Sequence, residues 1–183
     1  DVAIVHMEQG QAMTAFSAGQ GDILQLWAPL SYVAEAKGWT KVSSGMAAKV
    51  RIAGGIGARK DFAEKHPDLV VAWLGIYMRI IEGMKANPEQ YVKPLLEYFN
   101  GYCGLELTEE QVRMEFKYRP LYSVSEQVNA LEDPAKLATW MSGVANFMFD
   151  QGRITKKEFD RYVKANFFID PSFMKKLAAE TSK

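Results

Sequence analysis

Hydrophobic and polar residues change their spacing near residue 60. Before that point, short apolar runs alternate with Gly-containing turns and stretches of helical spacing. Short runs rich in β-branched residues between turn signals are typical of strands. The expected strands are residues 2–5, 22–26, 39–42 and 50–58, and the expected helices between them are 11–18 and 30–36. Because strand and helix alternate, this part predicts an α/β fold with a parallel sheet.

Residues 61–183 predict helices almost throughout, because helix-start signals recur there. A capping side chain followed three residues later by Glu or Gln satisfies backbone N–H groups at a helix start. The pairs with that spacing are Asp61/Glu64, Thr108/Gln111 and Thr155/Glu158, and Asp133-Pro134 and Asp170-Pro171 add an acid before a first-turn proline. Helices are therefore expected to begin near residues 62, 68, 109, 134, 156 and 171. Gly152 is expected to end one of them.

Two apolar stripes at helical spacing are interpreted as core. Their residues are Leu69, Val70, Trp73, Tyr77, Ile80, Ile81 and Met84 in the first, and Leu137, Trp140, Met141, Val144, Phe147 and Met148 in the second. A parallel sheet must be covered on both faces, and four short strands offer little surface for so many helices. This imbalance predicts that part of the fold lies N-terminal to Asp1.

Composition narrows the classes of function. Of the 183 residues, 48% are hydrophobic and the formal net charge is zero, so the basic excess of a nucleic-acid-binding protein is missing. No apolar run reaches the length of a membrane span. The single cysteine, Cys103, excludes an intramolecular disulfide and a multi-cysteine metal site, and a buried or half-buried position is expected for it. No metal or cofactor is expected.

The chain shows no signal peptide and starts at Asp1 without a Met, which suggests a removed leader or a truncated end.

Six motifs, in the same order, resemble one family. They are FSAGQGDI (16–23), LQLWAP (24–29), ARKDFAEKHPDLV (58–70), KANPE (85–89), FMFDQGRI (147–154) and FIDPSF (168–173). Together they cover nearly the whole chain. They resemble the C-terminal portion of ABC transporter substrate-binding proteins of the nitrate/sulfonate/taurine class, the type II periplasmic binding proteins. Whole members are about twice as long, with two α/β lobes around a hinge.

The resemblance implies a fold, a function and a location. The expected fold is a type II periplasmic-binding-protein fold with parallel-sheet lobes and a helix-rich C-terminal half, here incomplete. Residues 1–45 would belong to the later part of lobe two, and residues 46–183 to the returning strand and C-terminal helices of lobe one. The expected function is capture of a small anionic or sulfonate-like solute in the interlobe cleft for an ABC permease, without catalysis. The complete protein is expected to be a monomer in the periplasm or outside the cell, with a lipid anchor on the missing N-terminus.

Four residues are expected to contact the solute. Gln9 follows the first predicted strand and opens a helix, where N–H groups favour anions. Trp27 ends the second strand and offers a flat indole face. Gly54 and Gly55 lie in the crossing segment near the hinge. Family members that bind an amine need an acid in that segment, and the sequence register places Gly54 there, so taurine itself is not the expected solute.

Other interpretations stay open beside this one. The same fold includes binding proteins for a thiamin pyrimidine precursor, so a neutral heterocycle is an alternative solute. A ligand-sensing lobe without a transport role is another. An enzyme would need Cys103 near His6 or His66, which no local pattern supports, and the chain has no Walker, HExxH or GxGxxG motif.

Overall fold

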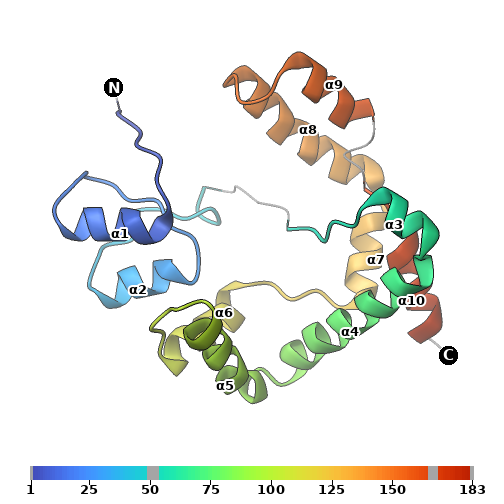
Figure 1. Ribbon diagram of the computed structural model, residues 1–183, viewed down its shortest axis with the longest axis horizontal. Helices are drawn as coiled ribbons and strands as arrows, with labels where there is room; N and C mark the ends of the chain where they lie inside the picture. Colours follow the sequence, from blue (N-terminus) through green and yellow to red (C-terminus); the bar gives the residue numbers. More distant parts are fainter. Residues whose placement is uncertain (1, 49–53, 165–168, 182–183) are drawn as a thin grey trace. The chain divides into compact units, whose positions relative to one another are not determined.

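The computed structural model describes residues 2–48, 54–164 and 169–181 (Figure 1). These ranges contain helices and connecting segments and no β-strand. The predicted α/β fold with parallel-sheet lobes is therefore wrong for the described part of the chain. Residues 2–5, 22–26 and 39–42 have no regular secondary structure, and of the fourth candidate the structure describes only residues 54–58, which are also irregular.

The failure of the strands has a physical reason. A strand is stabilised only when a neighbouring strand pairs with its backbone N–H and C=O groups, whereas a helix forms its hydrogen bonds within one segment. The predicted strands have the composition of strands but find no partner among the described residues. Their apolar side chains stay in solvent, as at Val2, Ile23 and Val42, which are 85%, 79% and 79% exposed.

The chain divides into two compact units, Asp1–Gly55 with Ala86–Pro120 and Ile56–Lys85 with Leu121–Lys183. A division between two lobes at residues 45 and 46 stays a prediction. The first unit contains α1 (Gln9–Ser17), α2 (Leu30–Ala36), α5 (Glu89–Glu97), the π-helical turn η1 (Tyr98–Tyr102) and α6 (Glu109–Tyr118). Its small core consists of Val92, Leu107 and Val112.

Polar contacts join α2 to α6 inside the first unit. The Gln111 side chain donates to the carbonyl oxygen of Tyr32 at 3.4 Å. The Tyr32 side chain is buried against Glu115, and burial and this carboxylate raise the pKa of Tyr32 to about 12. Arg119 lies 2.6 Å from the Glu115 carboxylate, so this buried acid has a cationic partner one turn along the helix.

The second unit contains α3 (Lys60–Lys65), α4 (Pro67–Ala86), α7 (Val124–Glu132), α8 (Pro134–Asp150), α9 (Lys156–Lys164) and α10 (Ser172–Thr181). Its core lies where α4, α7 and α10 meet and consists of Val71, Leu74, Met78, Val124, Met174 and Leu177. Ion pairs extend these contacts, between Lys176 and Asp68 and between Lys85 and Glu126. No helix in the described ranges combines the length and apolarity of a membrane-crossing segment.

Most predicted helix starts are confirmed. α6 begins after Thr108, which forms a complete capping box with Gln111, and Thr155 exchanges hydrogen bonds with Glu158 in front of α9. α8 begins at Pro134. Gly152 ends α8 in the left-handed conformation, with φ of 65°.

The Asp61 capping prediction is wrong, and two helices were missed. α3 begins at Lys60 without a side-chain cap, and Asp61 instead pairs with Arg59. α5 and α7 were not among the predicted starts. For α7 the signal is present in the sequence, because Ser123 and Glu126 form a capping box.

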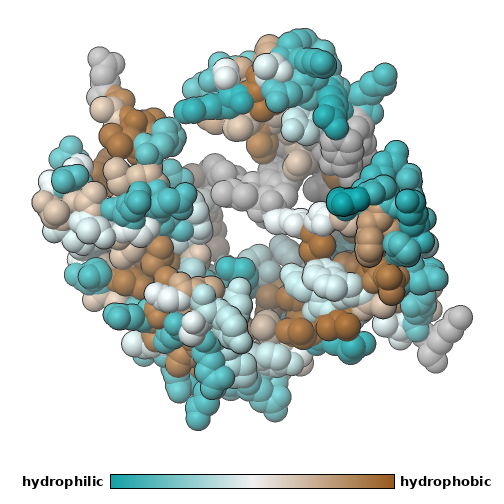
Figure 2. Space-filling view, in the orientation of Figure 1, coloured by the Kyte–Doolittle hydropathy of each residue, from teal (hydrophilic) through white to brown (hydrophobic). Residues whose placement is uncertain are grey.

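The first apolar stripe was assigned to the wrong face of α4. The buried residues of this helix are Val71, Leu74 and Met78, and Val70 and Ile81 are partly buried. Four of the seven predicted core residues are exposed: Leu69, Trp73, Tyr77 and Ile80. In the second stripe Val144, Phe147 and Met148 are also exposed, while the side chains of Leu137 and Trp140 lie outside the described residues. Figure 2 shows hydrophobic side chains at the surface in several parts of the molecule.

Candidate binding site

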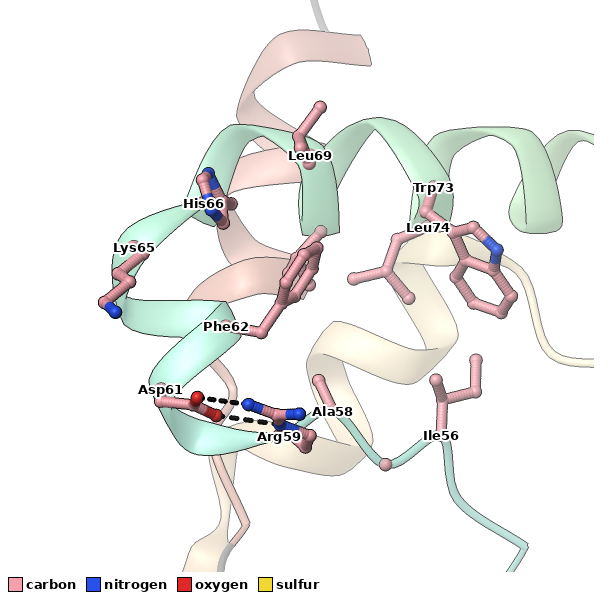
Figure 3. Close-up of a pocket in the computed structure, with 12 residues that line it drawn as sticks. Ile56, Ala58, Arg59, Asp61, Phe62, Lys65, His66, Leu69, Trp73 and Leu74 are labelled. Carbon is pink, nitrogen blue, oxygen red and sulfur yellow. Dashed lines mark hydrogen bonds and ion pairs between the residues drawn. The ribbon is translucent and has the colours of Figure 1, made fainter.

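A hollow of about 750 Å³ lies in the second unit, between the segment that precedes α3 and the beginning of α4 (Figure 3). Its size falls in the range of small-molecule pockets. The chain folds back here because His66, which precedes Pro67, leaves helical geometry at the end of α3. The apolar lining residues are Ile56, Ala58, Phe62, Leu69, Val70, Trp73 and Leu74, and the polar ones are Arg59, Asp61, Lys65 and His66.

Electrostatics at the pocket are set by a few side chains on its polar side. Arg59 donates from Nε to Asp61 Oδ1 at 3.0 Å, and this pairing raises the pKa of Arg59 and lowers that of Asp61. The ammonium group of Lys65 has no ion-pair partner among the described residues. The ring of His66 lies 5.1 Å from the ring of Phe62. The pocket can therefore hold an apolar or aromatic group, and the Lys65 ammonium group points away from it (Figure 3).

Within the described ranges, no group of three or more His, Cys, Asp or Glu side chains is placed to hold a metal ion.

Cys103 belongs to the first unit and is exposed, so the expectation of a buried thiol is wrong. It hydrogen-bonds the Tyr98 hydroxyl, which raises the pKa of Tyr98.

Two of the predicted solute-contacting residues lie together in the first unit. Gln9 is the first residue of α1. Its side-chain Oε1 accepts a hydrogen bond from the Trp27 backbone N–H at 2.7 Å, across 18 residues of sequence. The Trp27 side chain is 66% exposed. The contact involves the Trp27 backbone, so the indole ring is not used in it.

Gly54 and Gly55 lie in an exposed, irregular segment at the boundary between the units. A Cβ atom built on either glycine has no other atom within 4 Å, so the described structure does not require glycine there. The pocket begins at Ile56 and includes neither Gly54 nor Gly55, nor Gln9 or Trp27.

The pocket residues were missed for an identifiable reason. Phe62 lies in one of the motifs that resemble the family, and Trp73 lies in the apolar stripe that was interpreted as core. A stripe of apolar residues predicts burial but does not distinguish a core from the wall of a pocket. The apolar stripe is visible in the sequence, but only tertiary contacts show which of its residues line the pocket.

No family model matches this sequence, and no solved structure matches it. The chain is similar to a protein of Brachyspira hyodysenteriae whose name describes it, provisionally, as an ABC transporter periplasmic binding protein. The two are 27% identical over 155 residues, which cover 85% of this chain and 43% of the relative. The chain therefore spans less than half the length of this relative. The similarity supports a distant relationship to the substrate-binding proteins of ABC transporters in general and does not distinguish between solute classes.

Proposed function

We propose that this chain is part of the solute-binding component of an ABC importer, which captures a small solute outside the cytoplasm and delivers it to a membrane permease. The observation that carries the proposal is the similarity over 85% of the chain to a protein named as a periplasmic binding protein. The six motifs, which occur in the same order as in the family they resemble, are consistent with it. A binding protein of this kind needs no catalytic group.

The proposed solute is a small anion of the sulfonate or nitrate type, held by Gln9 and Trp27. Gln9 uses its Oε1 to accept from the Trp27 N–H, so the side-chain NH₂ group can donate to an oxygen of the solute. The exposed indole face of Trp27 can cover the apolar part of the same solute. Backbone N–H groups at Gly54 and Gly55 are the further proposed donors. Because no acid lies at Gly54, taurine is expected to bind poorly.

The test is calorimetry on the protein purified at its native length. Nitrate, methanesulfonate, benzenesulfonate, taurine and an aminopyrimidine are titrated separately. We expect a sulfonate or nitrate to bind. Gln9→Leu and Trp27→Ala should each weaken that binding at least about tenfold, which corresponds to 1.4 kcal/mol. Gln20→Leu, at an exposed glutamine outside the proposed site, is the matched control and should not change the binding.

Each remaining outcome has a definite meaning. Binding of the aminopyrimidine alone would replace the anion with a neutral heterocycle. Tight binding of taurine would contradict the argument from Gly54. If Phe62→Ala abolishes binding while Gln9→Leu does not, the solute lies in the pocket of the second unit. Absence of binding for all five compounds would count against the proposed solute class.

A further inference from the structure

Trp27 of the proposed solute site is attached to α2, the helix that follows it in the sequence. The Trp27 carbonyl oxygen accepts a hydrogen bond from the Ser31 N–H at 3.3 Å, in the first turn of α2. On its other side, the Trp27 N–H donates to the Gln9 side chain at the start of α1. The contact between Trp27 and Gln9 therefore depends on the position of α2.

Packing, more than its own hydrogen bonds, holds α2 in place. The helix has seven residues and no side chain caps its beginning, and a helix this short is marginal in water on its own. Its buried residues are Tyr32 and Ala34. The ring of Tyr32 lies 6.5 Å from the ring of Tyr118 at the end of α6, and the Gln111 amide of α6 donates to the Tyr32 carbonyl oxygen. Tyr32 therefore links α2 to α6.

Glu115 of α6 lies against Tyr32 and is itself only 4% exposed. One of its carboxylate oxygens lies 2.6 Å from Arg119 Nε, while the other, Oε1, has no hydrogen-bond partner within the described ranges. Burying a carboxylate that is not fully hydrogen-bonded is unfavourable. An apolar side chain is often at least as stable in such a position. Stability alone therefore does not account for an acid at this point of α6.

We propose that Glu115 is a positioning residue for the proposed solute site. Through Tyr32 it holds α2 on α6, and α2 in turn holds Trp27 on Gln9. All of these residues belong to the first unit. The consequence for solute binding rests on the proposed function, whereas the positioning of Trp27 is a property of the protein without solute.

Hydrogen exchange of the Trp27 backbone amide tests the proposal on the protein at its native length, with no solute present. Gln9→Leu gives the exchange rate when the hydrogen bond to this amide is absent. Glu115→Leu replaces the carboxylate by an apolar side chain of comparable size. We expect it to speed exchange at Trp27 at least about fivefold, the scale of one lost hydrogen bond. The amides of Val92 and Val112, in the core of this unit, should change less than about twofold.

Three further variants separate positioning from a merely structural role. Glu115→Gln keeps an oxygen that can accept from Arg119, so exchange at Trp27 should stay slow. Glu110→Leu, at an exposed glutamate of the same helix, is the matched control and should also leave this exchange unchanged. Tyr32→Phe removes only the hydroxyl and should speed exchange at Trp27, which keeps the test decisive if Glu115→Leu does not fold.

The outcomes that would overturn the proposal are specific. One is unchanged exchange at Trp27 in both Glu115→Leu and Tyr32→Phe. Another is an equal rise at Trp27 and in the core amides, because Glu115 would then only stabilise the first unit. For a solute found by calorimetry, Glu115→Leu should weaken binding at least about threefold, since fewer molecules hold Trp27 in place. If exchange changes as expected and no compound binds, only the proposed function is refuted.

Discussion

Replacing Met78 with alanine tests the core of the second unit most directly. Met78 is 1% exposed and lies where α4 meets α7 and α10, and its sulfur accepts a hydrogen bond from Gln127 at 3.1 Å. Removing a buried methionine side chain leaves a cavity and costs about 2–5 kcal/mol. Hydrogen exchange of the backbone amides measures this loss helix by helix. Amides in α4, α7 and α10 that exchange through unfolding of this unit should lose protection by about 30-fold or more, since each 1.4 kcal/mol is tenfold.

The matched control uses the same substitution at an exposed methionine. Met46 is 77% exposed, and Met46→Ala should change stability by less than about 0.5 kcal/mol. Met78→Leu keeps the volume and loses the sulfur acceptor, so its cost should stay below about 1.5 kcal/mol. A loss of less than about 1 kcal/mol for Met78→Ala would refute the assignment of this core. Equal loss of protection in α5 and α6 would contradict the division of the chain into two compact units.

Two further predictions concern helix starts. Thr108→Ala removes the side chain that accepts from the Gln111 N–H, and should destabilise α6 by about 1 kcal/mol, read from the exchange of its amides; Thr108→Ser should retain most of the stability. The Lys85 ammonium and the Ser123 N–H lower the pKa of Glu126 from its ordinary value of 4.5 to about 2. The stabilisation by this carboxylate is therefore complete above pH 4.5 and lost as the pH falls toward 2. In acid titrations followed by circular dichroism, Glu126→Gln should flatten this pH dependence, and an unchanged slope would contradict the assignment.

The predicted binding residues show what the sequence alone can and cannot predict about contacts between distant segments. Gln9 and Trp27 are predicted binding residues because Gln9 follows one predicted strand and Trp27 ends another, and neither strand is present in the described structure. The two residues nevertheless lie in contact through the Gln9 side chain. The contact arises because the irregular segment that follows α1 folds back to Gln9, the first residue of that helix. No local sequence pattern predicts this contact.

Several helix boundaries, those with local capping signals, are the part of this protein that the sequence determined by itself. Thr108 with Gln111, Thr155 with Glu158 and Gly152 act on backbone groups within four residues, so their effect is readable without tertiary structure.

Tertiary structure alone decided which side of α4 is buried and whether any strand finds a partner. Both depend on segments far apart in the chain, as in the contact of α4 with α10 around Leu74 and Leu177. A strand needs a neighbour to satisfy its backbone, and an apolar stripe needs a neighbour to exclude water. A sequence pattern indicates that a strand or an apolar stripe needs a neighbouring segment, but it does not identify which segment that is.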